Sequence, residues 1–386
     1  MDGVALPPIT DLRIDAQDDS TTLSQIARRG APMGKADTHV HTEYSGFQKL
    51  GAIKFPESVA SPEMQVDRAR ENGMDVVCIT DHDETHGAFI AEKYAQQKYN
   101  DIQVVPGEEV TTADGEIIGL FLTERVPDML PVEETIDIIR EQGGLTIAPH
   151  PFSFHVPGLK ERVLDIDIDG FEVVNGGHPD AYTNMFARLV MDRYPGKWCE
   201  TSGSDAHSVY TTGYNWTEFP GTTAEDFRRA ILDRRTRACG VAAPVFGQVQ
   251  WSVDVVIGGQ KLMLKSLQGR LKNVPKDHLI EKINSISDLK KATGIFAGML
   301  YVVPPMSFIA TALSVSYLKK GAARMTARIP ERMELIDQIV REVDAGGGPG
   351  ACRPAYLDNM TGSPLAEYQG LPFKVPFKQM GRMKER

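Results

Sequence analysis

The sequence predicts an α/β fold in which strands, mostly parallel, alternate with helices and approach a (β/α) barrel. Short apolar runs of strand length recur seven times between residues 35 and 204. Amphipathic helical patterns separate several of these runs, as is typical of parallel α/β folds. Histidines and carboxylates fall where the runs end, and in (β/α) barrels the active site lies at the carboxyl ends of the strands.

The predicted strands cover residues 35–41, 75–81, 102–112, 117–122, 145–150, 171–175 and 198–204. Seven strands are close to the eight of a complete barrel. The predicted helices cover residues 62–72, 132–142, 181–193 and 224–235. The first helix has the clearest boundaries, with Ser61 as N-cap, Pro62 at the first helical position and Gly73 as its stop.

The chain of 386 residues is long enough for a large domain and a smaller second region. We predict a flexible leader over residues 1–33, a barrel over 34–245, a mostly helical region over 246–344 and a Gly/Pro-rich basic tail over 345–386. The leader is polar and acidic, unlike a signal peptide. Four widely spaced cysteines form no disulfide pattern, which favours a reducing, cytoplasmic location.

The net charge of −10 argues against binding a large nucleic-acid duplex, because proteins that rely on phosphate contacts normally present a basic face. It does not exclude a small phosphorylated substrate, since bound metal ions supply local positive charge. The composition does not predict an oligomeric state.

Eight of the nine histidines lie between His39 and His207. His39 and His41 end the first predicted strand, and residues two apart in a strand point to the same face, so they can bind one metal together. Asp37 shares that face. The alternative is a pair of half-buried strand histidines without a ligand.

The next two predicted strands also end in polar groups. His82, between Asp81 and Asp83, closes an apolar run, where burial is unfavourable unless the groups are paired or bind metal; helix capping by either aspartate is the alternative. Glu108 and Glu109 follow, and a glutamate here could bridge two metals or belong to a solvated acidic turn. Strand alternation lets only one of the two face the site.

His150 stands between two prolines, and Asp205 and His207 share a face after the last predicted strand. The alternative for each is a polar loop residue. Imidazole and carboxylate ligands together suit Mn²⁺, Zn²⁺ or Fe²⁺ without choosing among them. Two or three clustered ions would activate a water and hold phosphate oxygens.

The motifs DTHVH, ITDHD, PGEEVTT, APHPF and SGSDAH, in this order, resemble the PHP (polymerase and histidinol phosphatase) family over about residues 35–240. The resemblance implies a distorted seven-stranded (β/α) barrel, a site for two or three divalent metal ions and hydrolysis of phosphate esters. The ligands it implies are His39, His41, Glu109 and Asp205 for the first ion, Glu109 and His150 for the second, and His82 and His207 for the third.

This chain departs from the family pattern at several positions. Ser45 stands near the place where many relatives carry an aspartate or histidine, which weakens the case for a third ion. Glu116 stands where many relatives have a histidine, and is either an oxygen ligand or an exposed strand-start residue. His155 and His178 are candidates for phosphate contact or surface histidines. Glu172 matches an acidic family position to which we assign no role.

We therefore predict a metal-dependent phosphoesterase that hydrolyses a phosphate mono- or diester of a small substrate by metal-activated water, with Asp205 or His207 moving protons. One alternative is an amidohydrolase-like barrel acting on C–N bonds, a class that often bridges its metals with a modified lysine; no strand-end lysine stands out here. The other alternative is a catalytically inactive metal-binding scaffold.

Residues 292–318 carry no charge and are flanked by lysine pairs at 290–291 and 319–320. The stretch is long enough to span a membrane, but prolines 304 and 305 near its middle would break a helix. One interpretation is a re-entrant hairpin that holds the protein at a membrane, with both ends cytoplasmic. The other is a buried helix pair on the barrel, or a dimer surface.

Overall fold

The computed structural model describes residues 32–50, 53–240, 245–272, 278–303, 305–346 and 348. The predicted leader, apart from residues 32 and 33, lies outside the described residues. So does the predicted tail, apart from residues 345, 346 and 348.

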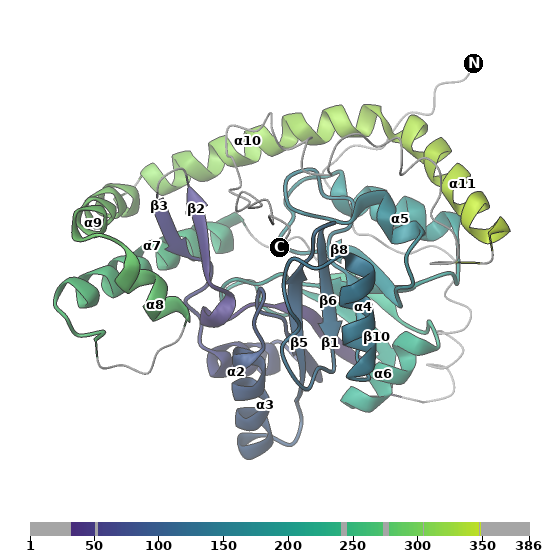
Figure 1. The fold of residues 1–386 in the computed structure, drawn as a ribbon, viewed down its shortest axis with the longest axis horizontal. Helices are drawn as coiled ribbons and strands as arrows, with labels where there is room; N and C mark the ends of the chain where they lie inside the picture. Colours follow the sequence, from purple (N-terminus) through teal and green to yellow (C-terminus); the bar gives the residue numbers. More distant parts are fainter. Residues whose placement is uncertain are drawn as a thin grey trace, which may run out of the picture.

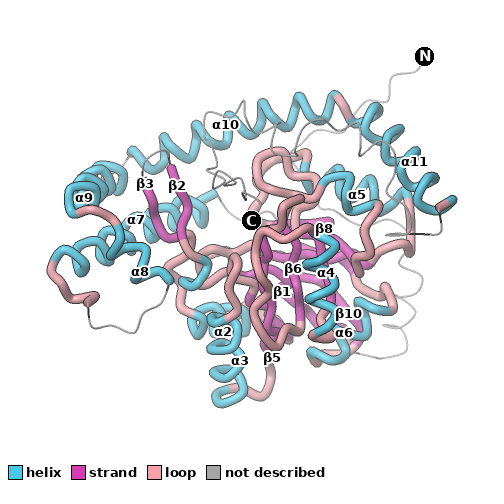
Figure 2. Tube along the Cα trace, viewed as in Figure 1, coloured by secondary structure: helices cyan, strands magenta, loops and turns pink. Residues whose placement is uncertain are grey.

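A nine-stranded sheet forms the centre of the molecule, in the order β11-β10-β1-β4-β5-β6-β7-β8-β9, with helices outside it (Figure 2). The strands are β1 Met33–Val40, β4 Val76–Ile79, β5 Gln103–Thr111, β6 Glu116–Leu120, β7 Leu145–Ala148, β8 Gly170–Asn175, β9 Cys199–Gly203, β10 Asn215–Pro220 and β11 Arg237–Gly240. Hydrogen bonds also connect the β9 end of this sheet to its other side. The Ser202 amide on β9 donates to Thr217 Oγ1 on β10 at 2.8 Å, and the His41 amide just after β1 donates to the Ala206 carbonyl just after β9 at 3.0 Å. The sheet is therefore nearly closed into a barrel.

All seven predicted strands are present, as β1 and β4 through β9. Strand β6 runs antiparallel to both β5 and β7, whereas the other six predicted strands all run in one direction. The four residues between β5 and β6 explain this, because a parallel neighbour needs a crossover of a dozen or more residues. Gly115 in that turn has φ 149°, a conformation that favours glycine. Strands β10 and β11 extend the sheet beyond β1 and were not predicted.

Five helices cover the barrel: α2 Pro62–Glu71, α3 His86–Lys98, α4 Val132–Glu141, α5 Thr183–Arg193 and α6 Ala224–Leu232. Helix α2 begins as predicted, since Ser61 Oγ accepts from the Met64 amide and Pro62 is the first helical residue. Helix α6 begins with a reciprocal capping box between Thr223 and Asp226. Only α3 was not predicted among these five.

The C-terminal region is helical, as predicted, with α7 Val245–Leu267, α8 His278–Ser285, α9 Asp288–Val302, α10 Met306–Ala327 and α11 Ile329–Ala345. A small hairpin of β2 Phe47–Leu50 and β3 Ile53–Pro56 lies beside this region. Figure 1 shows α10 crossing one side of the molecule between α9 and α11. Helix α11 joins the barrel's apolar core through the buried side chains of Ile336 and Ile339.

The uncharged segment 292–318 forms two helices rather than one. Helix α9 ends at Val302 and α10 begins at Met306, with a bend of 85° between them, so the prolines interrupt the helix as predicted. No single helix in the described residues is long and apolar enough to cross a membrane, although this bent pair passes that test by length and composition. Many of its apolar side chains are exposed, which contradicts the interpretation as a fully buried pair.

Candidate metal centre

The eight predicted ligands come together at one end of the barrel. They stand at or just beyond the ends of β1, β4, β7 and β9 and within the β5–β6 hairpin. They form overlapping groups in which imidazole nitrogens and carboxylate oxygens lie within 4.8 Å of one another. These groups are His39–His41–Asp205, His39–Glu109–His150, His82–Glu109–Glu116 and His41–His82–His207.

The first group has spacings that suit a shared cation. His39 Nε2 and His41 Nε2 are 2.9 Å apart, and both lie near Glu109 Oε2, at 3.1 and 3.3 Å. Asp205 Oδ1 lies 3.7 and 3.3 Å from the same two nitrogens. Four ligands bound at about 2.0–2.2 Å in a tetrahedron are separated by roughly 3.3–3.6 Å. The side chains therefore present an almost assembled set of four donors.

Glu109 belongs to two of these groups and lies beside the nitrogens of His39 and His41 in the first. Its Oε2 lies 3.1 Å from His82 Nδ1 as well as from His39, and its Oε1 lies 3.1 Å from His150 Nε2. Glu108 points to the opposite side of the strand, where its Oε2 accepts from the Val126 amide at 2.7 Å. Of the two glutamates that competed for the site in the sequence, Glu109 is therefore the one that faces it.

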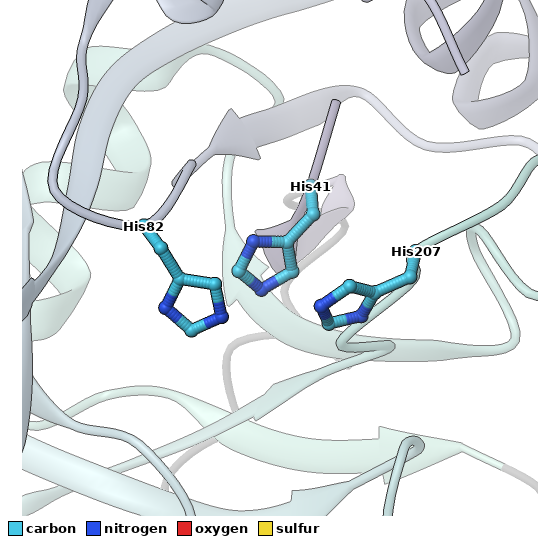
Figure 3. Close-up of side chains that lie close together, drawn as sticks. All are labelled: His41, His82 and His207. Atoms are coloured by element: carbon cyan, nitrogen blue, oxygen red, sulfur yellow. The ribbon is translucent and has the colours of Figure 1, made fainter. Parts of the chain in front are cut away.

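The group of His41, His82 and His207 consists of three imidazoles that point toward one another (Figure 3). The His41 ring centre lies 4.6 Å from that of His82 and 4.1 Å from that of His207. His207 Nδ1 lies 3.1 Å from the Asp205 carbonyl oxygen, which can only accept, so Nδ1 carries the proton. His207 Nε2 is then a buried lone pair with no hydrogen-bond partner among the described residues. Because an unsatisfied buried acceptor is unfavourable by roughly 1–3 kcal/mol, this nitrogen suits a metal.

Ser45 contacts a predicted ligand, His41, through its hydroxyl. Its hydroxyl donates to Asp81 Oδ1 at 2.7 Å and accepts from His41 Nδ1 at 2.9 Å. That proton position leaves His41 Nε2 free to face Glu109 and Asp205. The departure from the family pattern at Ser45 thus removes a possible ligand but fixes the ring of another.

Glu172 has the same kind of role. Its Oε1 accepts from His39 Nδ1 at 3.0 Å, and its Oε2 accepts from the His150 amide at 2.9 Å and from Asn175 Nδ2 at 2.8 Å. It therefore holds one histidine by its ring and another by its backbone. His150 has φ 29° and Asp205 has φ 49°, in a left-handed region that is strained for these residues and persists only where surrounding contacts impose it.

Burial and crowding shift the acid–base properties of these groups. Burial, reinforced by the neighbouring Glu109 carboxylate, raises the pKa of Glu116 to about 8. Burial opposes charge on His82, but nearby carboxylates, Glu109 first, outweigh it and raise its pKa to about 10. Burial and the imidazole of His207 hold the pKa of His41 well below its usual range. The protons bound to these side chains offset the negative charge of the carboxylates, and bound cations would take the place of those protons.

Two residues near the site were not found from the sequence. Glu57, just after β3, is buried, with Oε1 3.7 Å from His82 Nε2. Trp251, on α7, donates its indole N–H to the Glu57 carbonyl at 3.0 Å, and its ring lies edge-on to His207 at 6.0 Å. Neither belongs to a strand-end motif. The first helix of the C-terminal region thus forms part of the wall of the metal centre.

His178 is buried rather than on the surface, and its ring stacks on that of His150 at 5.0 Å. Its two ring nitrogens contact Asn175 Oδ1 at 2.9 Å and Ser153 Oγ at 3.0 Å. His155 Nε2 lies 3.0 Å from Asp180 Oδ2. These side chains thus form a hydrogen-bonded layer behind His150.

A nearly closed α/β barrel with histidines and carboxylates gathered at its strand ends defines a metal-binding barrel protein. Residues 37–136 match the model of the PHP domain, and residues 183–236 match that of a PHP-associated region. The uncharacterized protein MJ1587 of Methanocaldococcus jannaschii is 47% identical over 153 residues, which cover 40% of this chain and 88% of that protein. The chain therefore belongs to the PHP family.

Two further likenesses are weaker or shorter. The uncharacterized protein MJ1588 of the same organism is 34% identical over 110 residues, covering 28% of this chain and 92% of that protein. A solved structure from Bacteroides vulgatus, a two-domain protein containing a predicted PHP-like metal-dependent phosphoesterase, is 20% identical with a TM-score of 0.45. That likeness covers 55% of this chain and 66% of the Bacteroides chain.

Proposed function

We propose that this protein is a hydrolase that cleaves a phosphate mono- or diester with two or three divalent ions, Mn²⁺, Zn²⁺ or Fe²⁺, held at the candidate metal centre. The observation that carries the proposal is the position of Glu109. This single carboxylate lies 3.1 Å from nitrogens of His39, His82 and His150, so it can join adjacent ions. Paired ions a few ångströms apart are typical of enzymes that displace groups at phosphorus.

The residues divide between holding ions and moving protons. His39, His41, Glu109 and Asp205 would hold the first ion; His150, Glu116, His82 and His207 would complete the others. Bound ions would lower the pKa of a coordinated water and neutralise charge on the phosphate oxygens. Asp205 is the group we assign to proton transfer. Its Oδ1 faces His39 and His41, whereas its Oδ2 accepts only a long hydrogen bond of 3.3 Å from Asn175 in the described structure.

His207 is the other residue for which the sequence predicted proton transfer. Its free nitrogen, Nε2, faces the group of three imidazoles, whereas its Nδ1 proton is held by a carbonyl. The geometry therefore favours a ligand role for His207 and leaves Asp205 as the better proton acceptor.

We propose a small phosphorylated substrate. His39, His41 and Glu109 are almost completely buried, and the net charge of −10 opposes approach of a nucleic-acid duplex. The bridging position is held by Glu109 and not by a lysine, which supports phosphoester over C–N hydrolysis.

The test is turnover by the purified full chain loaded with each metal in turn, against a generic phosphomonoester, a phosphodiester and an amide. We expect metal-dependent hydrolysis of one of the phosphate esters, lost in Glu109→Gln and kept in Glu108→Gln, the adjacent glutamate on the other face. Turnover of the amide alone would identify a C–N hydrolase. Stoichiometric metal with no turnover of any substrate would identify a scaffold.

A further inference from the structure

Exposed apolar side chains gather on helices α9 and α10. In the barrel such residues are scattered, as on most proteins, at Met64, Met129, Leu189 and Leu232. On α9, α10 and the break between them the exposed set is Leu289, Phe296, Met299, Leu300, Val303, Met306, Phe308, Ile309 and Leu313. Phe296 and Leu313 are 62% and 67% exposed. We call this set, with the bend that joins it, the apolar elbow.

The dimensions of the elbow match one leaflet of a bilayer. The uncharged parts of its arms, residues 292–302 and 306–318, are about 16 and 20 Å long at 1.5 Å per residue. The hydrocarbon core of a bilayer is roughly 30 Å thick, so neither arm can cross it, but each can reach into one half. The bend of 85° between the helices lets the chain turn within that half.

Two of the described amides beside the bend are hydrogen-bonded to carbonyls of the bend. Prolines 304 and 305 have no N–H group. The Met306 amide donates to the Val303 carbonyl at 3.0 Å, and the Ile309 amide donates to the Pro305 carbonyl at 3.0 Å. Unpaired backbone groups are what excludes loops from lipid, so these bonds reduce that penalty.

The charges around the elbow have the opposite sign to those of the whole chain. Residues 288–328 contain six lysines and arginines and a single acidic residue, Asp288, whereas the chain carries a net charge of −10. Lys290, Lys319 and Lys320 are exposed and lie at the far ends of the arms, away from the bend. Cations that flank an apolar segment in this way are attracted to anionic lipid headgroups.

We propose that the apolar elbow inserts shallowly into one leaflet of an anionic lipid bilayer, with the flanking lysines among the headgroups. A second copy of the chain fits less well, because it carries the same cationic flanks and so lacks the complementary charge that an anionic lipid surface supplies. Insertion would also place the barrel at the membrane surface, because α10 packs on a loop of the barrel. Gly321 of α10 lies so close to Phe154, in the loop after His150, that a Cβ at Gly321 would lie 2.4 Å from the Phe154 ring.

The test is flotation of the full chain with vesicles of phosphatidylcholine alone or with about 30% phosphatidylglycerol, with no substrate present. We expect the wild type to float with the anionic vesicles. We expect Leu300→Gln with Leu313→Gln to bind at least tenfold more weakly. The matched control, Leu189→Gln with Leu232→Gln, replaces two exposed leucines on the barrel and should bind like the wild type.

The charge contribution is tested by Lys319→Gln against Lys93→Gln, an exposed lysine on α3. The first should weaken binding to anionic vesicles several-fold, an effect that disappears at high salt, and the second should not. Circular dichroism verifies that each variant is folded.

Failure of the wild type to float with either vesicle overturns the proposal. If the wild type is also dimeric by light scattering, and the elbow double variant is monomeric, the surface is instead an interface between two copies. Equal loss of binding in the elbow and barrel variants would overturn the proposal as well.

Discussion

Replacing Glu172 with glutamine should weaken the binding of metal at the candidate metal centre without removing any of the predicted ligands. The Glu172 carboxylate accepts three hydrogen bonds, from His39 Nδ1, the His150 amide and Asn175 Nδ2. A glutamine can keep its oxygen toward the two donors His150 and Asn175. Its NH₂ group then faces His39 Nδ1, which must become an acceptor and transfer its proton to Nε2. That is the nitrogen that faces Glu109 and Asp205.

The expected loss follows from this change of tautomer. Substitution of residues that orient a metal ligand typically weakens metal affinity 10–100-fold, which corresponds to about 1.4–2.7 kcal/mol. Because glutamine keeps the bond to the His150 amide, we attribute the whole of this loss to the His39 ring. The effect should fall on the ion shared by His39 and Glu109.

The assay is competition for Mn²⁺ between the protein and a chelating fluorescent indicator, for the wild type, Glu172→Gln and the matched control Glu108→Gln. Nitrogen-15 spectra of the histidine rings report the tautomer of His39 independently of any activity. Wild-type affinity together with an unchanged His39 tautomer in Glu172→Gln would refute the reasoning. Loss of affinity in Glu108→Gln as well would show that any buried glutamate matters, not this contact.

Three further changes test other parts of the structure. Glu109→Gln should lower the metal bound per chain, measured by elemental analysis after dialysis, by more than one ion, because the carboxylate serves several groups; loss of one ion or none would contradict sharing. Ser45→Ala leaves His41 Nδ1 without its hydroxyl partner and removes one of the hydrogen bonds to Asp81 Oδ1, so it should reduce the free energy of unfolding by roughly 1–3 kcal/mol in urea; an unchanged urea midpoint would contradict this. Burial raises the pKa of Glu108 to about 8 from an ordinary 4.5, so the folded state retains a proton that the unfolded chain loses, and wild-type stability falls as pH rises between these values. The free energy of unfolding of Glu108→Gln, measured in urea at fixed metal concentration, should therefore rise relative to that of the wild type by up to a few kcal/mol between pH 5 and pH 8.5. A difference that does not depend on pH would exclude this assignment.

The sequence was sufficient for the barrel strands because each is a short apolar run that ends in a polar group. The gathering of the candidate ligands could be predicted in part for the same reason, since buried imidazoles such as His82 are unfavourable at a strand end unless they are paired or bind metal. The assignment of each candidate to an ion, and the choice of Glu116, came from the resemblance to the PHP family. Prolines 304 and 305 also predicted the break in segment 292–318, because a helix does not continue through them. These features depend on local sequence, so the periodicity of apolar residues and the cost of burying polar groups are enough to predict them.

Other features depend on contacts between distant segments. The reversed direction of β6 follows from the length of one turn, and the positions of β10 and β11 follow from pairing that local patterns do not encode. Glu57 and Trp251 reach the metal centre from a hairpin and from α7, about 190 residues apart in the chain. Ser45 and Glu172 act through hydrogen bonds to histidine rings, and only the folded geometry shows which atom each one contacts.

The shared position of Glu109 has a consequence for how the centre fills. Ions that use one carboxylate cannot load independently, because the first occupant draws on the negative charge that the second also needs and repels it. By thermodynamic reciprocity, the second ion weakens the first by the same factor. The protein would then release one ion readily while retaining another, so the degree of filling would follow the supply of metal around it.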